Sequence, residues 1–175
     1  IKALINNTKI FIFKRIIESL GLIIVAFGFF LLISFFSHSS EDPNFLLSEN
    51  IEIKNFFGFY GSVVSDVFFQ SFGLISYLFS LTLILIGINI IFEKKILVFI
   101  NCLFYSSIYL LLGSLLFTTL PIDNYHLIIN GNGGFVGKFL SDSLLSQIFK
   151  INLSLFQIIF YILIFFIFFL SINFK

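Results

Sequence analysis

The sequence predicts an all-α integral membrane protein whose four transmembrane helices form two parallel hairpin repeats, with short interfacial helices in the outer loops. The first observation is composition: 59% of the residues are hydrophobic and 11% are charged, whereas soluble domains carry about 25% charged residues. The second observation is that four stretches lack charge, and each is long enough to cross a bilayer core of about 30 Å as a helix. These stretches lie between Glu18 and Glu41, Asp66 and Glu93, Lys95 and Asp123, and Lys150 and Lys175.

The third observation is a nine-residue motif that occurs twice. Residues 58–66 return as residues 134–142, with five of the nine positions identical. A polar loop precedes each copy and a long apolar run follows it, so the chain repeats one plan of helix, loop, motif and helix. Six positions of the motif are therefore candidate structural or interaction residues: Gly58, Gly61, Asp66, Gly134, Gly137 and Asp142.

The four spans are expected at about residues 16–36, 69–91, 96–117 and 151–170. They belong to a single membrane-anchor domain that covers residues 1–175. A basic segment precedes the first span, and the apolar run that follows it is too long for a cleaved signal peptide. Glu18, in the first turn of that span, is expected to pair with Lys14 near the membrane surface.

Small residues at seven-residue intervals mark helix-packing faces in the first two spans. The clearest stripe is Gly73, Ser80 and Gly87 in the second span, and Gly21 and Gly28 share one face of the first. Small side chains let a second helix approach closely. The pattern does not distinguish a contact within one subunit from a contact between subunits.

A polar excursion separates the two spans of each hairpin. In the first excursion, Pro43 stops a helix and the preceding Asp42 favours a turn. His38 is expected to be a solvated loop histidine, because no second His or Cys lies at metal-ligand spacing. The glycines after Asn55 predict a short helix at the membrane interface, with its aromatic side chains at headgroup depth.

The distribution of charge sets the expected orientation. With four spans, both chain ends and the 93–95 turn lie on one side, which holds seven of the ten basic residues. The other side holds three basic residues and seven acidic ones. Because cytoplasmic loops carry an excess of Lys and Arg, we expect both chain ends in the cytoplasm and both polar loops outside.

The residues show no catalytic, cofactor or metal motif, so no such site is expected in this segment. Loop 131–138 has Asn132 and Phe139 where a phosphate-binding loop requires Gly and Ser or Thr. Inside the spans, Asn101 and Gln157 are expected to hydrogen-bond between helices. An alternative function is a small transporter or channel built from the two parallel hairpins, although no ionisable side chain falls near the middle of a span.

Several short motifs follow one another in a fixed order after the basic start. They are Glu18-x-x-Gly21, Ser37-His-Ser-Ser-Glu-Asp-Pro43, Asn55-x-x-Gly58-x-x-Gly61 with Asp66, Phe72-Gly73 and Gly133-Gly134-x-x-Gly137. Their order and spacing resemble the N-terminal four-span membrane domain of bacterial DNA translocases of the FtsK/SpoIIIE family. The resemblance covers nearly all of the chain.

The resemblance implies a longer parent protein. In that family a cytoplasmic ATPase motor follows the fourth span, uses ATP and Mg²⁺, and assembles as a hexameric ring that pumps double-stranded DNA. The motor would lie beyond residue 175. The resemblance also implies a location in the bacterial inner membrane at the division septum, with the lipid bilayer, further copies of the chain and divisome proteins as partners.

Two interpretations fit the Ser-Asp pair that closes each copy of the motif. In the first, the pairs at Asp66 and Asp142 cap and aim the following helix, while the glycines let a short interfacial helix pack closely. In the second, the motif forms a surface that meets division partners on the outer side of the membrane.

Overall fold

The computed structural model describes residues 2–43, 52–120, 127, 130–143 and 153–172. These residues contain helices and no strand, in the order α1 (Lys2–Phe36), α2 (Gly58–Phe72), the 3-10 turn η1 (Gly73–Ile75), α3 (Ser76–Glu93), α4 (Leu97–Thr119), α5 (Gly134–Asp142) and α6 (Leu153–Ile172). Four stretches are long and apolar enough to cross a membrane: Asn6–Phe36, Gly58–Glu93, Leu97–Thr119 and Leu153–Ile172. The predicted all-α membrane class is therefore confirmed.

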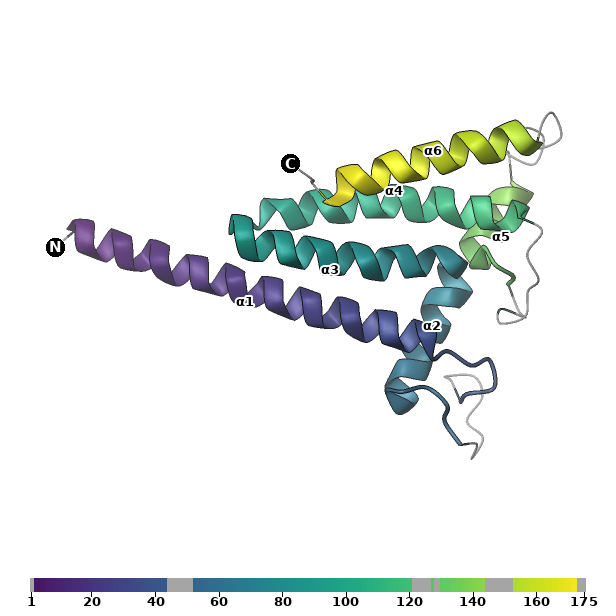
Figure 1. The fold of residues 1–175 in the computed structure, drawn as a ribbon, viewed down its shortest axis with the longest axis horizontal. Helices are drawn as coiled ribbons and strands as arrows, with labels where there is room; N and C mark the ends of the chain where they lie inside the picture. The colour runs from purple at the N-terminus through teal and green to yellow at the C-terminus, as the bar shows by residue number, and fades with distance from the viewer. Residues whose placement is uncertain (1, 44–51, 121–126, 128–129, 144–152, 173–175) are drawn as a thin grey trace.

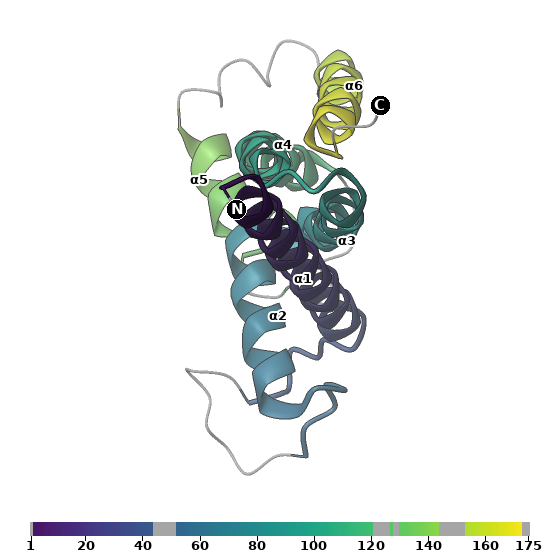
Figure 2. The same ribbon diagram turned by 90° about the vertical axis from the view of Figure 1, so that its left-hand side faces the viewer.

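The four long helices pack in the order α1, α3, α4 and α6. Figure 1 shows them side by side, and Figure 2 shows the same row from its end. Successive long helices run in opposite directions, so the start of α1, the turn between α3 and α4 and the end of α6 share one end of the molecule, here named the terminal end. The helices α2 and α5 lie at the opposite end, here named the loop end (Figure 1).

Helices α1 and α3 pack closely because small residues face each other at two levels. A Cβ atom on Gly21 would stand 2.9 Å from the Gly87 carbonyl oxygen, and one on Gly28 would stand 3.1 Å from the Ser80 carbonyl oxygen. Both distances are too short for an ordinary side-chain contact, so only small residues fit. The structure places this face of α3 inside the subunit, against α1.

The second expected span is interrupted by a bend. We expected a helix over about 69–91, but α2 ends at Phe72 and α3 begins at Ser76. Gly73 lies at the bend between them with a φ of 73°, a conformation that glycine adopts without steric cost. The Leu74 amide donates to the Asn132 carbonyl oxygen at 2.9 Å, which fixes the bend. Gly73 is therefore not part of the α3 packing face.

The other spans differ from the sequence estimates mainly at their ends. Helix α1 starts at Lys2 rather than near residue 16, because the basic segment contains no Pro or Gly that would stop it. At 35 residues, α1 is about 52 Å long at 1.5 Å per residue. Figure 1 shows its first part projecting beyond the terminal end. Helices α4 and α6 each end about two residues later than expected.

Glu18 joins α1 to the turn between α3 and α4. Its carboxylate forms ion pairs with Arg15 and with Lys94, rather than with Lys14 as the sequence suggested. Lys94 reaches this position because it ends α3 in the left-handed conformation, with φ 56°. The pair with Lys94 ties α1 to the bundle at the terminal end, whereas Arg15 lies on α1 itself.

Polar side chains within the spans bond mostly inside the subunit. The buried Tyr109 hydroxyl and Thr82 Oγ1 are 2.7 Å apart, and Gln157 donates to the Thr119 carbonyl oxygen at 3.0 Å. Asn89 donates to the Ile172 carbonyl oxygen. The expected interhelical role therefore fits Gln157, whereas Asn101 lies exposed on α4.

Candidate functional site

The most elaborate polar arrangement in the described chain lies at the loop end, where the 37–43 segment meets residues 54–57 and α2. Its side chains bond mainly to backbone groups and to one another. We name this arrangement the loop clasp and define it by six residues: Ser34, His38, Asp42, Asn55, Ser62 and Ser65.

Asp42 is a buried carboxylate in the loop clasp, with 2% of its surface exposed. Its Oδ1 accepts the Lys54 amide and its Oδ2 accepts the Asn55 amide, each at 2.9 Å. Buried charge is tolerated when hydrogen bonds satisfy it. Next to Asp42, the Pro43 carbonyl oxygen accepts the Ser62 hydroxyl at 2.9 Å. The expected turn at Asp42-Pro43 is therefore also a bridge between both ends of the loop and α2.

Asn55 closes the end of α1. The last four carbonyl groups of a helix lack partners within the helix, and the Asn55 amide Nδ2 donates to the Ser34 carbonyl oxygen at 2.9 Å. Its Oδ1 accepts the Phe57 amide at 3.1 Å. The side chain is packed so tightly that a Cβ on Gly61 would stand 2.9 Å from its Cγ. Gly61 therefore makes room for Asn55.

His38 is not the solvated loop histidine that the sequence suggested. Its imidazole is half-buried, and Nδ1 lies 3.0 Å from the Ser65 hydroxyl oxygen. The ring meets Phe69 edge-on at 4.8 Å between centroids. The Ser65 hydroxyl in turn donates to the Ser62 carbonyl oxygen at 2.9 Å. His38 thus joins the loop to the middle of α2.

The first glycines of the two motifs adopt the same backbone conformation. Gly58 begins α2 with a φ of 61°, and Gly134 begins α5 with a φ of 65°. Their surroundings differ, because a Cβ on Gly58 would meet nothing within 4 Å, whereas one on Gly134 would stand 2.7 Å from the Gly73 amide nitrogen. The second glycine, Gly137, lies against α4, where an added Cβ would stand 2.7 Å from the Ser114 carbonyl carbon.

The first Ser-Asp pair does not cap a following helix. Ser65 and Asp66 lie in the middle of α2, and Asp142 is the last residue of α5. The Asp66 carboxylate accepts a long hydrogen bond of 3.5 Å from Gln70, while Asp142 is exposed. For the first pair the capping interpretation is therefore wrong, because an N-cap must precede the first turn of its helix. For the second pair it stays a prediction, because residues 144–152 lie outside the described residues.

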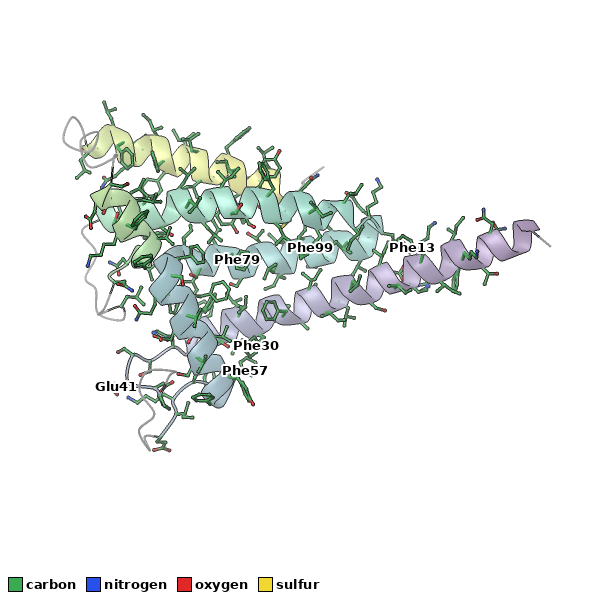
Figure 3. All side chains as sticks on the ribbon, turned by 180° about the vertical axis from the view of Figure 1, so that it is seen from behind. Phe13, Phe30, Glu41, Phe57, Phe79 and Phe99 are labelled. Carbon is green, nitrogen blue, oxygen red and sulfur yellow. The ribbon has the colours of Figure 1, made fainter. Side chains whose placement is uncertain are left out.

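Aromatic side chains gather on the outward faces of α2 and α5. Phe56 is 80% exposed and Tyr60 is 78% exposed. On α5, the exposed rings of Phe135 and Phe139 stack at 6.2 Å between centroids. The Phe57 ring, which is 41% exposed, lies 4.8 Å from the Phe30 ring of α1 between centroids, a pair labelled in Figure 3. Helices with one aromatic face suit a membrane interface.

An exposed ion pair flanks the loop clasp. Lys54 Nζ donates to Glu41 (labelled in Figure 3). The hydrogen bond from Lys54 lowers the pKa of the Glu41 carboxyl below its ordinary value. The same bond raises the pKa of Lys54 above its ordinary value. Both residues are therefore charged over the whole neutral range, and the pair links residues 41 and 54.

The loop clasp holds backbone segments together. Among the described residues, no group of three or more His, Cys, Asp or Glu side chains is arranged to hold a metal ion. The clasp side chains donate to or accept from backbone groups, which suits a support for the loop-end surface.

Sequence reasoning missed the roles of His38, Asp42 and Asn55. The sequence places His38 in a solvated loop because no second His or Cys lies at ligand spacing, and Asp42 in a turn because Pro43 follows. It places Asn55 at the end of the polar excursion. The available signal was that all three belong to the short motifs on which the family resemblance rests. Their contacts, which span the whole loop, appear only in three dimensions.

The sequence of this chain is similar to that of a known protein family. Residues 13–175 match the family described as the 4TM region of DNA translocase FtsK/SpoIIIE. Searches of curated proteins and of solved structures gave no match. The family match covers nearly the whole chain and agrees with the four helices that could span a membrane. The chain therefore belongs to the family of four-transmembrane regions of FtsK/SpoIIIE DNA translocases.

Proposed function

We propose that this chain is the membrane-anchoring and assembly domain of an ATP-driven translocase of double-stranded DNA that acts at the division septum. The observation that carries the proposal is the family match over residues 13–175. In support, the structure brings the end of α6 to the same end of the molecule as the start of α1 (Figure 1). A motor attached after residue 175 would then work beside the N-terminal segment.

The proposed location is the inner membrane, with the terminal end in the cytoplasm. The terminal end carries the basic residues of α1 and of the α3–α4 turn. The loop end carries five of the seven acidic residues in the described chain: Glu41, Asp42, Glu52, Asp66 and Asp142. The positive-inside rule assigns the basic end to the cytoplasm. The aromatic faces of α2 and α5 would then lie at the outer membrane interface.

The proposal assigns no catalytic residue to this segment. ATP and Mg²⁺ would bind the motor beyond residue 175, and DNA would reach the protein through that motor. Copies of the chain would assemble as a hexamer, and divisome proteins would be met through the loop end. Asp142 is the leading contact candidate there, because its side chain is exposed at the end of α5.

Localisation in the native cell tests the proposal. A fluorescent fusion to residues 1–175 should collect at the division septum, and the reading frame after Lys175 should encode a nucleotide-binding motor. Asp142→Asn should reduce septal signal while leaving the membrane level unchanged. Glu52→Gln, which removes another exposed acid at the loop end, is the matched control. Uniform fluorescence around the membrane, or a frame that stops at residue 175, would contradict the proposal.

A further inference from the structure

The first part of α1 carries an excess of positive charge. Residues 2–17 contain four basic residues and no acidic one. At the terminal end, the nearest acids in the described chain are already paired: Glu18 with Arg15 and Lys94, and Glu93 with Lys95 at 3.9 Å. Glu18 therefore balances Arg15, whereas Lys9 and Lys14 form no ion pair with an acidic side chain among the described residues.

The same segment exposes four consecutive large apolar side chains. Ile10, Phe11, Ile12 and Phe13 are each 47–60% exposed. Figure 3 labels Phe13 at the point where α1 leaves the bundle. Four adjacent residues cover every side of a helix, at 3.6 residues per turn. Apolar surface of this extent next to lysines is typical of a segment that meets a membrane surface.

An open groove continues from this segment into the span. It has a volume of about 370 Å³ and runs along α1 from Phe11 to Ile23. Its lining is apolar apart from Ser19 and Arg15, whose guanidinium lies 5.1 Å from the centre of the Phe11 ring. A cationic group beside an apolar groove matches a phospholipid, with a charged phosphate next to a hydrocarbon chain.

We propose that residues 2–17 of α1 bind the surface of an anionic bilayer, with Lys9 and Lys14 near lipid phosphates and Ile10–Phe13 in the interface. The groove beside Arg15 then takes an acyl chain. A second copy of the segment is a poorer occupant, because it would bring two sets of like charges together. The proposal rests on the proposed membrane location and specifies which lipid the terminal end recognises.

The absence of Trp from the chain makes a direct test possible. Phe13→Trp introduces a single tryptophan, which can be excited apart from the tyrosines, into the 175-residue protein. The protein is placed in nanodiscs that mix phosphatidylcholine with phosphatidylglycerol. Brominated acyl chains, which quench Trp on contact, are carried by one lipid or the other. Brominated phosphatidylglycerol should quench more strongly than brominated phosphatidylcholine, and high salt should remove the difference because surface charge is screened.

Charge variants separate specific binding from simple burial. Lys9→Gln with Lys14→Gln should lower the preference for phosphatidylglycerol roughly twentyfold, since each basic residue near the surface contributes about fivefold. Arg15 is kept, because it pairs with Glu18. Phe165→Trp, on an exposed face of α6, is the control and should be quenched equally by both lipids.

Equal quenching of Phe13→Trp by the two lipids, or no quenching by either, would overturn the proposal. Emission that instead changes with the number of proteins per disc would show that a second copy covers the segment. The assay involves neither septum nor motor, so its failure would leave the proposed anchoring function intact.

Discussion

At the scale of the residue, the loop clasp depends on one buried charge. Asp42 holds the amides of Lys54 and Asn55, and these two residues begin the path into α2. The chain between Pro43 and Lys54 therefore starts and ends at the same carboxylate. The Asp42 carboxylate therefore stabilises the loop locally, because the two amides that donate to it belong to adjacent residues.

Replacing this carboxylate with an amide should loosen the loop. In Asp42→Asn, an NH₂ group takes the place of one acceptor and faces a backbone donor, at a cost of about 1–3 kcal/mol in unfolding free energy. Hydrogen exchange at the Lys54 and Asn55 amides should speed up, and denaturant titration in micelles should report the loss. Glu52→Gln, at an exposed position, should leave both measurements unchanged. Wild-type exchange in Asp42→Asn would contradict the assigned contacts.

The Glu41–Lys54 pair makes the loop sensitive to extreme pH. The lowered pKa of Glu41 means that the pair stabilises the loop above the ordinary carboxyl pKa and stops doing so as the pH falls through the lowered value. The raised pKa of Lys54 sets the upper pH limit, because the stabilisation by the pair is lost as the pH rises through that raised pKa. Lys54→Gln should therefore return the Glu41 pKa upward towards its ordinary value in an NMR titration.

A matched change at another loop-end lysine provides the control for this titration. Lys138→Gln removes an exposed positive charge on α5, and Glu41 should then titrate as in the wild type. If Lys54→Gln left the pKa of Glu41 unchanged, the ion pair would not form in solution.

At the scale of the element, the two motif copies give a matched pair of glycines. Gly58→Ala and Gly134→Ala both place a side chain in the left-handed region, at about 1–2 kcal/mol each. Only the added methyl at Gly134 would also press on the backbone of Ser71 and Gly73, so it should cost about 1–3 kcal/mol more. In denaturation experiments in micelles, the Gly134→Ala variant should be clearly less stable than the Gly58→Ala variant. Equal stabilities would contradict the close contact of Gly134 with Ser71 and Gly73.

The packing of α1 on α3 gives a second element-scale prediction. Gly87→Leu should force the helices apart, because a Cβ there would already stand 2.8 Å from the Gly21 carbonyl oxygen, and should cost at least about 1–3 kcal/mol. Ala26→Leu, on the exposed side of α1, should leave stability within about 0.5 kcal/mol of the wild type. Since the contact lies within the subunit, oligomer size should change only where the fold is lost.

The sequence predicted the helices better than it predicted the breaks between them. Charge-free stretches identify spans because the bilayer penalises charge, and Gly21 and Gly87 identify a close contact because packed helices need small residues. Gly73 fits the same seven-residue interval as Ser80 and Gly87, yet it forms a bend. What distinguishes it is the Asn132 carbonyl, which comes from the second loop. A pattern within one span carries no information about a partner from another loop. In the same way, the sequence around His38 does not reveal its contact with Ser65.

At the scale of the whole molecule, the position of the only cysteine makes the orientation testable. Cys102 is fully buried, so it should not react with a maleimide that cannot cross membranes. Ser40→Cys, at the loop end, should react in intact cells, whereas Lys95→Cys, at the terminal end, should react only after permeabilisation. Asn7→Cys should behave like Lys95→Cys. The reverse pattern would invert the proposed topology, and labelling of the unsubstituted protein would show that Cys102 is accessible.

The bond from Leu74 to Asn132 also bears on the biogenesis of the protein. When the ribosome has completed the first hairpin, the carbonyl that fixes the Gly73 bend has not yet been synthesised, because it follows the third span. The first half of the chain thus enters the bilayer before its own bend is fastened, and the second half completes it. The two halves share a plan in sequence, but neither is a self-sufficient unit, and a chain cut at the α3–α4 turn would have to reassemble from two pieces.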